Sequence, residues 1–70
     1  MFELIGKKAV VQYLTGTGVM EYLFNHPCGD VWQIDMDSDD NIVRVYIDGE
    51  KIALDNKEVV ATVNAMIELI

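Results

Sequence analysis

An imidazole, a thiol and a carboxylate stand within five residues of one another, at His26, Cys28 and Asp30. A cysteine nucleophile needs a histidine ring that reaches its sulfur and a third group that orients the ring, and distant parts of a chain usually supply them. Pro27 lies between the two groups in a segment that predicts a tight turn, so this geometry is not expected. As zinc ligands the three side chains are too few without a second copy of the chain. Since Ser38 is the only serine and His26 the only histidine, we expect no catalytic residue, metal or cofactor, and no enzyme.

A run of carboxylates has oxygen donors at alternate positions, as in the first half of a calcium-binding loop. These donors are Asp35, Asp37, Asp39 and Asn41. However, Tyr46 takes the position of the bidentate acid and Asp40 that of the glycine. Calcium binding is therefore a secondary hypothesis, and a solvated hairpin tip is the main one.

Acidic side chains dominate the chain, with 12 Asp and Glu against 5 Lys and Arg and a formal charge of −7. Seven of the acids lie between Asp30 and Glu50, where Arg44 is the only basic residue. Nucleic acid is not an expected partner, because proteins bind phosphate backbones with Lys and Arg. Such a surface attracts basic proteins, although the charge also keeps an apolar chain soluble. The predicted recognition face comprises Asp35, Asp37, Asp39, Asp40, Tyr46, Asp48 and Glu50.

The chain has 70 residues, 51% of them apolar, and the size of one domain, residues 1–70. A fold of this size buries only about 60% of the surface of its unfolded chain. Cys28 is the only cysteine, so no internal disulfide adds stability, and self-association is the remaining common device. The sequence predicts neither a membrane-spanning helix nor a secretory signal. We expect a cytoplasmic homo-oligomer with no membrane partner.

Short segments rich in β-branched residues alternate with turn residues over the first three quarters of the chain. The predicted strands are residues 9–14, 19–24, 31–37, 42–47 and 50–54. The connections between them, at 15–18, 26–29, 38–41 and 48–49, are all of hairpin length. The pattern predicts an α+β fold in which a five-stranded antiparallel meander, strongly curled or closed into a small barrel, precedes one helix.

Two turns predict the same apolar face of this sheet. A four-residue loop at 38–41 places Trp32, Ile34 and Met36 opposite Ile47, Val45 and Val43, and Asp35 opposite Arg44. A two-residue hairpin at Asp48-Gly49 places Val45 opposite Ile52 and Val43 opposite Leu54. Agreement between independent turns favours this register.

The first hairpin predicts Gln12 opposite Glu21 and groups Met20, Tyr22 and Phe24 on one face. These residues share the face of Trp32 only if the turn at 26–29 contains a bulge, for which Gly29 suits the left-handed position. The opposite face keeps Val10, Leu14, Val19 and Leu23, which a curled sheet or a partner subunit would cover.

Residues 56–70 follow a helical period, and Asp55 with Glu58 has the form of a capping box. The helix is apolar on two sides, which is more than one sheet face can cover. Its second side is the predicted oligomer interface, with a core helix as the alternative. The interface residues are Val59, Val60, Val63, Met66, Ile67, Leu69 and Ile70.

Several short motifs over residues 4–54 share the pattern of a known family. They are residues 4–11 with Gly16, then Gly18-Val19, Phe24-Asn25-His26 and Asp30-Val31, and finally residues 47–52 around Asp48-Gly49. In these motifs the chain resembles the Sm/Hfq-like family of small five-stranded barrels. The resemblance implies a curved barrel that assembles edge to edge into a ring, with a base-binding pocket at Asn25, Asp30, Asp48 and Gly49.

This chain departs from the family pattern at the implied pocket. Asn25 stands where the family has Asp, and Asp30 where it has Asn. Asp48 replaces the Arg of the family's Ile-Arg-Gly turn, which reverses the charge there, and the C-terminal helix has no counterpart in the core pattern. Fold alone does not transfer function.

The leading hypothesis is a non-catalytic homo-oligomeric module that binds a basic protein surface, in the manner of inhibitors, immunity proteins or nucleic-acid mimics. The alternative is an oligomer that binds a small ligand or nucleotide in a pocket between subunits, as in an Sm-like ring. The residues predicted for that pocket are Asn25, His26, Asp30, Trp32, Asp48 and Gly49.

Overall fold

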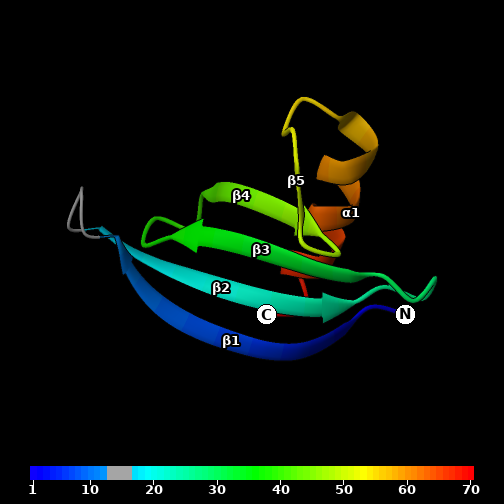
Figure 1. Ribbon diagram of the computed structural model, residues 1–70, viewed down its shortest axis with the longest axis horizontal. Coiled ribbons are helices and arrows are strands. Elements are labelled where there is room, and N and C mark those ends of the chain that lie inside the picture. Colours follow the sequence, from blue (N-terminus) through cyan, green and yellow to red (C-terminus); the bar gives the residue numbers. More distant parts are fainter. Residues whose placement is uncertain (13–16) are drawn as a thin grey trace.

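The computed structural model describes residues 1–12 and 17–70 and shows an open antiparallel sheet with one helix (Figure 1). The strands are β1 (Glu3–Gln12), β2 (Thr17–Asn25), β3 (Val31–Asp37), β4 (Ile42–Ile47) and β5 (Glu50–Ile52), and the helix is α1 (Lys57–Ile67). They lie in the sheet in chain order. The predicted α+β meander with a C-terminal helix is confirmed. The barrel alternative is wrong, because β1 and β5 are the two edges of an open sheet.

Two hairpins of the sheet are closed by the same kind of loop, at residues 26–30 and 37–41. In each segment the first residue donates its N–H to the carbonyl of the fifth, at 2.9 and 3.0 Å. The fourth residue is left-handed, Gly29 with φ 100° and Asp40 with φ 63°. This is a three-residue loop in which a left-handed residue follows a type I turn. The prediction for Gly29 is confirmed. The four-residue loop at 38–41 is wrong, because Asp40 adopts the left-handed conformation.

The predicted register of β3 against β4 holds for most of its length. Trp32, Ile34 and Asp35 lie opposite Ile47, Val45 and Arg44. Met36 lies opposite Ile42 and not opposite Val43, because a bulge next to Met36 compensates for the shorter loop.

The β4–β5 hairpin turns at Asp48 and Gly49, whose φ values are 51° and 84°. Two left-handed residues make the type I′ turn that matches strand twist. The predicted pair of Val45 with Ile52 is confirmed. The predicted pair of Val43 with Leu54 is wrong, because β5 ends at Ile52.

Gly49→Ala is expected to lower the free energy of unfolding by about 1 kcal/mol, because an L side chain is strained at positive φ. A Cβ at this position would meet no atom within 4 Å, so the effect is conformational. Urea unfolding measures it. Gly18→Ala is the control, since a Cβ there is also free of contacts and no left-handed φ is required. An equal loss in both variants would contradict the turn assignment.

The first hairpin is paired differently from the prediction. Gln12 lies opposite Thr17, and Glu21 opposite Lys8, so the predicted pair of Gln12 with Glu21 is wrong. Residues 15 and 16 of the predicted connection, together with Leu14, lie outside the described residues. β1 begins well before residue 9 and contains a bulge between Leu4 and Gly6.

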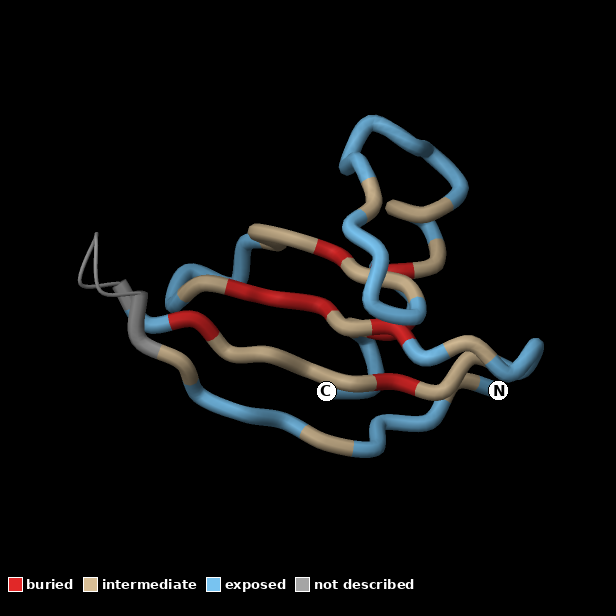
Figure 2. Tube along the Cα trace, viewed as in Figure 1, coloured by how far each residue is buried: buried red, intermediate tan, exposed pale blue. Residues whose placement is uncertain are grey.

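The core lies between α1 and one face of β2, β3 and β4 (Figure 2). Phe24 lies opposite Trp32, which confirms their common face. From Glu3 to Val10, β1 contributes no buried residue. The core residues are Phe24, Trp32, Ile34, Met36, Val45, Val63 and Met66.

Helix α1 is capped by Asn56, whose side chain accepts the backbone N–H groups of Glu58 and Val59 at 3.1 and 3.3 Å. The predicted capping box at Asp55 is therefore wrong, because the N-cap is the next residue, Asn56. Asp55 and Asn56 are both good caps, so residue type alone does not decide between them.

The predicted oligomer interface on the helix is largely used within one chain. Val63 and Met66 are fully buried in the core, and Val59 and Ile67 pack against it. The prediction is wrong for Val63 and Met66, because packing within one chain leaves neither of them exposed. Val59 and Ile67 are half-buried, and their place in an interface stays a prediction. Val60 is half-buried, and Leu69 and Ile70 are exposed after the helix.

Candidate functional site

The β3–β4 tip, residues 37–41, presents three carboxylates on a tightly bonded turn. Oδ1 of Asp37 accepts the backbone N–H groups of Asp39 and Asn41 at 3.0 and 2.9 Å. Asp40 donates its N–H to the Asp37 carbonyl at 3.1 Å. Asp37 thus orders the turn, and the side chains of Asp39 and Asp40 remain exposed.

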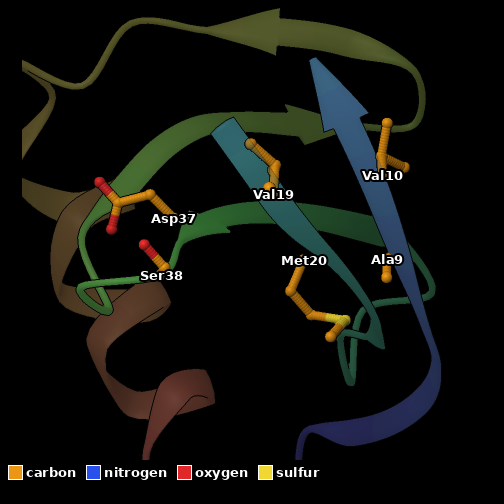
Figure 3. A pocket seen from close by; sticks show the side chains of 7 residues that line it. Ala9, Val10, Val19, Met20, Asp37 and Ser38 are labelled. Atoms are coloured by element: carbon orange, nitrogen blue, oxygen red, sulfur yellow. The ribbon is translucent and has the colours of Figure 1, made fainter. Parts of the chain in front are cut away.

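A first apolar hollow of about 250 Å³ lies beside the tip (Figure 3). Figure 3 shows Val19 and Met20 of β2 between Ala9 and Val10 of β1 and the start of the β3–β4 tip. The residues that line this first hollow are Ala9, Val10, Gly18, Val19, Met20, Asp37 and Ser38. Of the described residues in this lining, only Asp37 is charged.

A second hollow of about 240 Å³ lies between the sheet and the end of α1. Tyr22, Met36, Ile67 and Ile70 line it together with Asp40. Asp37 therefore lies at the edge of the first hollow, with its carboxylate pointing away from Val19 and Met20 (Figure 3), and Asp40 lies at the edge of the second. This arrangement suits a ligand that carries cationic groups on apolar stems, as Lys and Arg do.

The predicted recognition face is divided in the structure. Asp37, Asp39 and Asp40 lie at the β3–β4 tip, whereas Asp48 and Glu50 lie at the β4–β5 turn. The six residues of β4 separate the two groups, about 20 Å at 3.3 Å per residue. The extended conformation of β4 therefore places the two acidic groups at opposite ends of one strand.

Asp35 does not belong to any exposed acidic surface. It is 2% exposed, and its carboxylate accepts Nε of Arg44 at 3.1 Å and Nε2 of Gln33 at 3.0 Å. The prediction of Asp35 as a recognition residue is wrong for this reason. Tyr46 is half-buried and lies opposite Gln33.

A row of charges crosses four strands at Asp35. Lys8, Glu21, Asp35 and Arg44 lie opposite one another in successive strands. Two acids are neighbours at its centre, which is unfavourable, and a base follows at each end. Arg44 therefore compensates the negative charge of Asp35, which is buried and lies next to a second acid in the adjacent strand.

The residues predicted for a ligand pocket come together at the other end of the sheet. The His26 ring stacks on Trp32 at 5.7 Å between centroids, and Phe2 packs on His26 at 5.2 Å. Asp48 accepts the Val31 N–H on Oδ1 at 2.9 Å and donates its own N–H to the Val31 carbonyl at 2.8 Å.

Neither of the two hollows is lined by any residue of the predicted pocket: Asn25, His26, Asp30, Trp32, Asp48 and Gly49. The sequence reasoning missed Phe2, which lies far from Trp32 in the chain and packs on His26. A pocket at this end stays a prediction. Within residues 1–12 and 17–70, Nε1 of Trp32 is buried without a hydrogen-bond partner.

Cys28 belongs to the same turn as His26. The backbone N–H of Cys28 donates a hydrogen bond to Nδ1 of His26 at 3.1 Å. The thiol of Cys28 donates one to Oδ2 of Asp30, with 3.2 Å between Sγ and Oδ2. Because Nδ1 is used by the backbone and the ring is stacked on Trp32, these contacts describe an ordered turn with an exposed thiol.

The four residues of the calcium hypothesis do not form a common set of ligands. Asp35 is bound to Arg44, and Asp37 accepts two backbone N–H groups of the tip. In the described part of the chain, no group of three or more His, Cys, Asp or Glu side chains has an arrangement that could hold a metal.

The chain matches no model of a protein family, no curated protein and no solved structure in comparisons with each. The Sm/Hfq-like resemblance over residues 4–54 therefore stays a hypothesis. Within the described residues, no helix has the length and apolar character needed to cross a membrane.

Proposed function

We propose that this chain is a non-catalytic binding module that docks on a basic protein surface through the β3–β4 tip. The proposal is supported by the placement of Asp37 beside an apolar hollow and of Asp40 beside a second hollow of mixed polarity, on either side of one turn.

The chemistry of the two hollows suits Arg or Lys from a partner. The methylene stem of such a side chain buries its apolar part against Val19 and Met20 or against Ile67, and its charged head reaches a carboxylate. Among the described residues, no basic side chain lines either hollow. The formal charge of −7 adds long-range attraction, which raises the rate of association at low salt.

The test compares two variants with equal net charge. The tip variant carries Asp37→Asn, Asp39→Asn and Asp40→Asn. The control carries Asp48→Asn and Glu50→Gln at the β4–β5 turn and Asp55→Asn just before α1. Asn keeps an oxygen acceptor at position 37 and tolerates the left-handed conformation at 40 and 48. Both variants lose three negative charges, so they differ only in where the charge is lost.

Affinity capture from a lysate of the source cells, followed by mass spectrometry, measures the effect. We expect proteins with basic isoelectric points to be retained by the unmodified chain and the control, and to be lost with the tip variant. Retention should also weaken as salt rises. Equal capture by all three proteins, or capture that does not respond to salt, would contradict the proposal.

A further inference from the structure

We propose that a second copy of the chain pairs with the free edge of β1, antiparallel and centred on Gly6. This inference does not depend on the proposed function, because it concerns a different edge of the sheet. β1 has ten residues, and within residues 1–12 and 17–70 no strand lies on its outer side. A long free edge offers unpaired N–H and C=O groups to another strand. Leu4 and Ile5 on this strand are 38% and 46% exposed.

The bulge in β1 determines which of its charges share a face. Glu3 lies opposite Asn25, and Lys8 opposite Glu21. Asn25 and Glu21 are four residues apart in a regular strand, so they lie on the same face. Glu3 and Lys8 therefore also share a face, although their spacing in a regular strand would place them on opposite faces.

Self-pairing of β1 can use this arrangement in one register. With Gly6 opposite Gly6 of the partner subunit, Glu3 lies opposite the partner's Lys8, and Lys8 opposite the partner's Glu3. The two-fold symmetry repeats the contact, as in other isologous interfaces. Leu4 then lies opposite the partner's Lys7, which is on the same face as Leu4.

Other registers of the same strand are disfavoured, because they bring like charges together or pair residues that lie on opposite faces of the sheet. A register centred between Lys7 and Lys8 brings four ammonium groups together. Pairing Glu3 with Lys7 fails because the two residues lie on opposite faces, as their partners Asn25 and Tyr22 do. The lysines also make β1 a poor surface for the basic partner proposed above, so a second copy is the occupant that the charges favour.

Light scattering at increasing concentration tests the inference. The expected mass is that of a dimer, twice the 7.9 kDa of one chain. A mass that stays at 7.9 kDa, or a larger ring built from β1 against β5, would overturn it.

Charge exchange tests the register. Glu3→Lys and Lys8→Glu each turn both cross-strand ion pairs into repulsions, so each variant should dimerise at least about tenfold more weakly. An equimolar mixture of the two restores both pairs in a heterodimer. Glu50→Lys on β5 is the control with the same charge change as Glu3→Lys, and it should dimerise normally.

The mixture keeps the test independent of folding defects. Lys8→Glu places an acid opposite Glu21 within its own chain, so circular dichroism of each variant must show a folded protein. Recovery of the dimer only in the mixture supports the inference. Dimers of Glu3→Lys alone with unchanged affinity, or a mixture of folded variants that stays monomeric, would overturn it.

Discussion

Arg44→Met is expected to lower the free energy of unfolding by about 2 kcal/mol. The substitution leaves Asp35, which is 2% exposed, without its guanidinium partner and next to Glu21 in the adjacent strand. Breaking a buried ion pair commonly costs about 3–5 kcal/mol. The lower figure applies here because the Arg44 side chain is 31% exposed, so water screens part of the interaction.

A double variant separates this effect from lost packing. Asp35→Leu with Arg44→Met removes both charges, and its stability should recover to near that of the unmodified chain, as for other buried pairs replaced by apolar residues. Lys51→Met on the exposed edge strand controls for the loss of a positive charge and should change stability by less than about 0.5 kcal/mol. Urea unfolding, monitored by the fluorescence of Trp32, gives the free energies of unfolding of the unmodified chain and of the three variants. A double variant less stable than Arg44→Met would contradict this account of Asp35.

Met66→Ala is expected to have the largest effect on stability, about 3 kcal/mol. Met66 is fully buried between α1 and the sheet, and its truncation leaves a cavity that the surrounding strands cannot close. In a chain of 70 residues, a loss of this size is a large part of the total stability.

Leu69→Ala is the matched control for Met66→Ala. Leu69 is 49% exposed, so its truncation should cost less than about 1 kcal/mol. If α1 were an interface between subunits, Leu69 would be buried in the oligomer, and both variants would lose stability in a concentration-dependent way. Equal losses that grow on dilution would therefore contradict the assignment of α1 to the core.

The order of strands and most of the registers of β3 with β4 and of β4 with β5 could be predicted from the sequence, whereas the register of β1 with β2 could not. Alternation of apolar residues places Trp32 and Ile34 on one face, and the two-residue turn at Asp48-Gly49 has few alternatives. Both constraints act over a few residues. They therefore survive in the structure, and Ile34 lies opposite Val45 as predicted.

Features that depend on distant parts of the chain could not be predicted in this way. Burial of Asp35 needs the sheet around it. The packing of Phe2 on His26 needs β1 to extend to Glu3. The choice between a three-residue and a four-residue loop depends on whether Asp40 becomes left-handed, and Asp tolerates either conformation.

The acidic residues of the candidate site could be predicted from the sequence, but the hollows beside them could not. Asp37, Asp39 and Asp40 are exposed or half-exposed at one tip, as an acidic turn sequence indicates. The hollows beside them bring β1, β2 and the end of α1 together. No sequence pattern relates Val19 or Ile67 to the tip, so only the packed fold identifies the apolar half of the site.

The most direct test of the proposed function is a two-dimensional NMR titration of the ¹⁵N-labelled chain with a short peptide of Arg, Leu and Gly. We expect amide shifts centred on residues 37–41, Val19, Met20 and Ile67, with small shifts at residues 48–50. A peptide in which Glu replaces Arg should leave these signals in place. Shifts of equal size at both acidic turns, or none at the tip, would contradict the β3–β4 tip as the binding site.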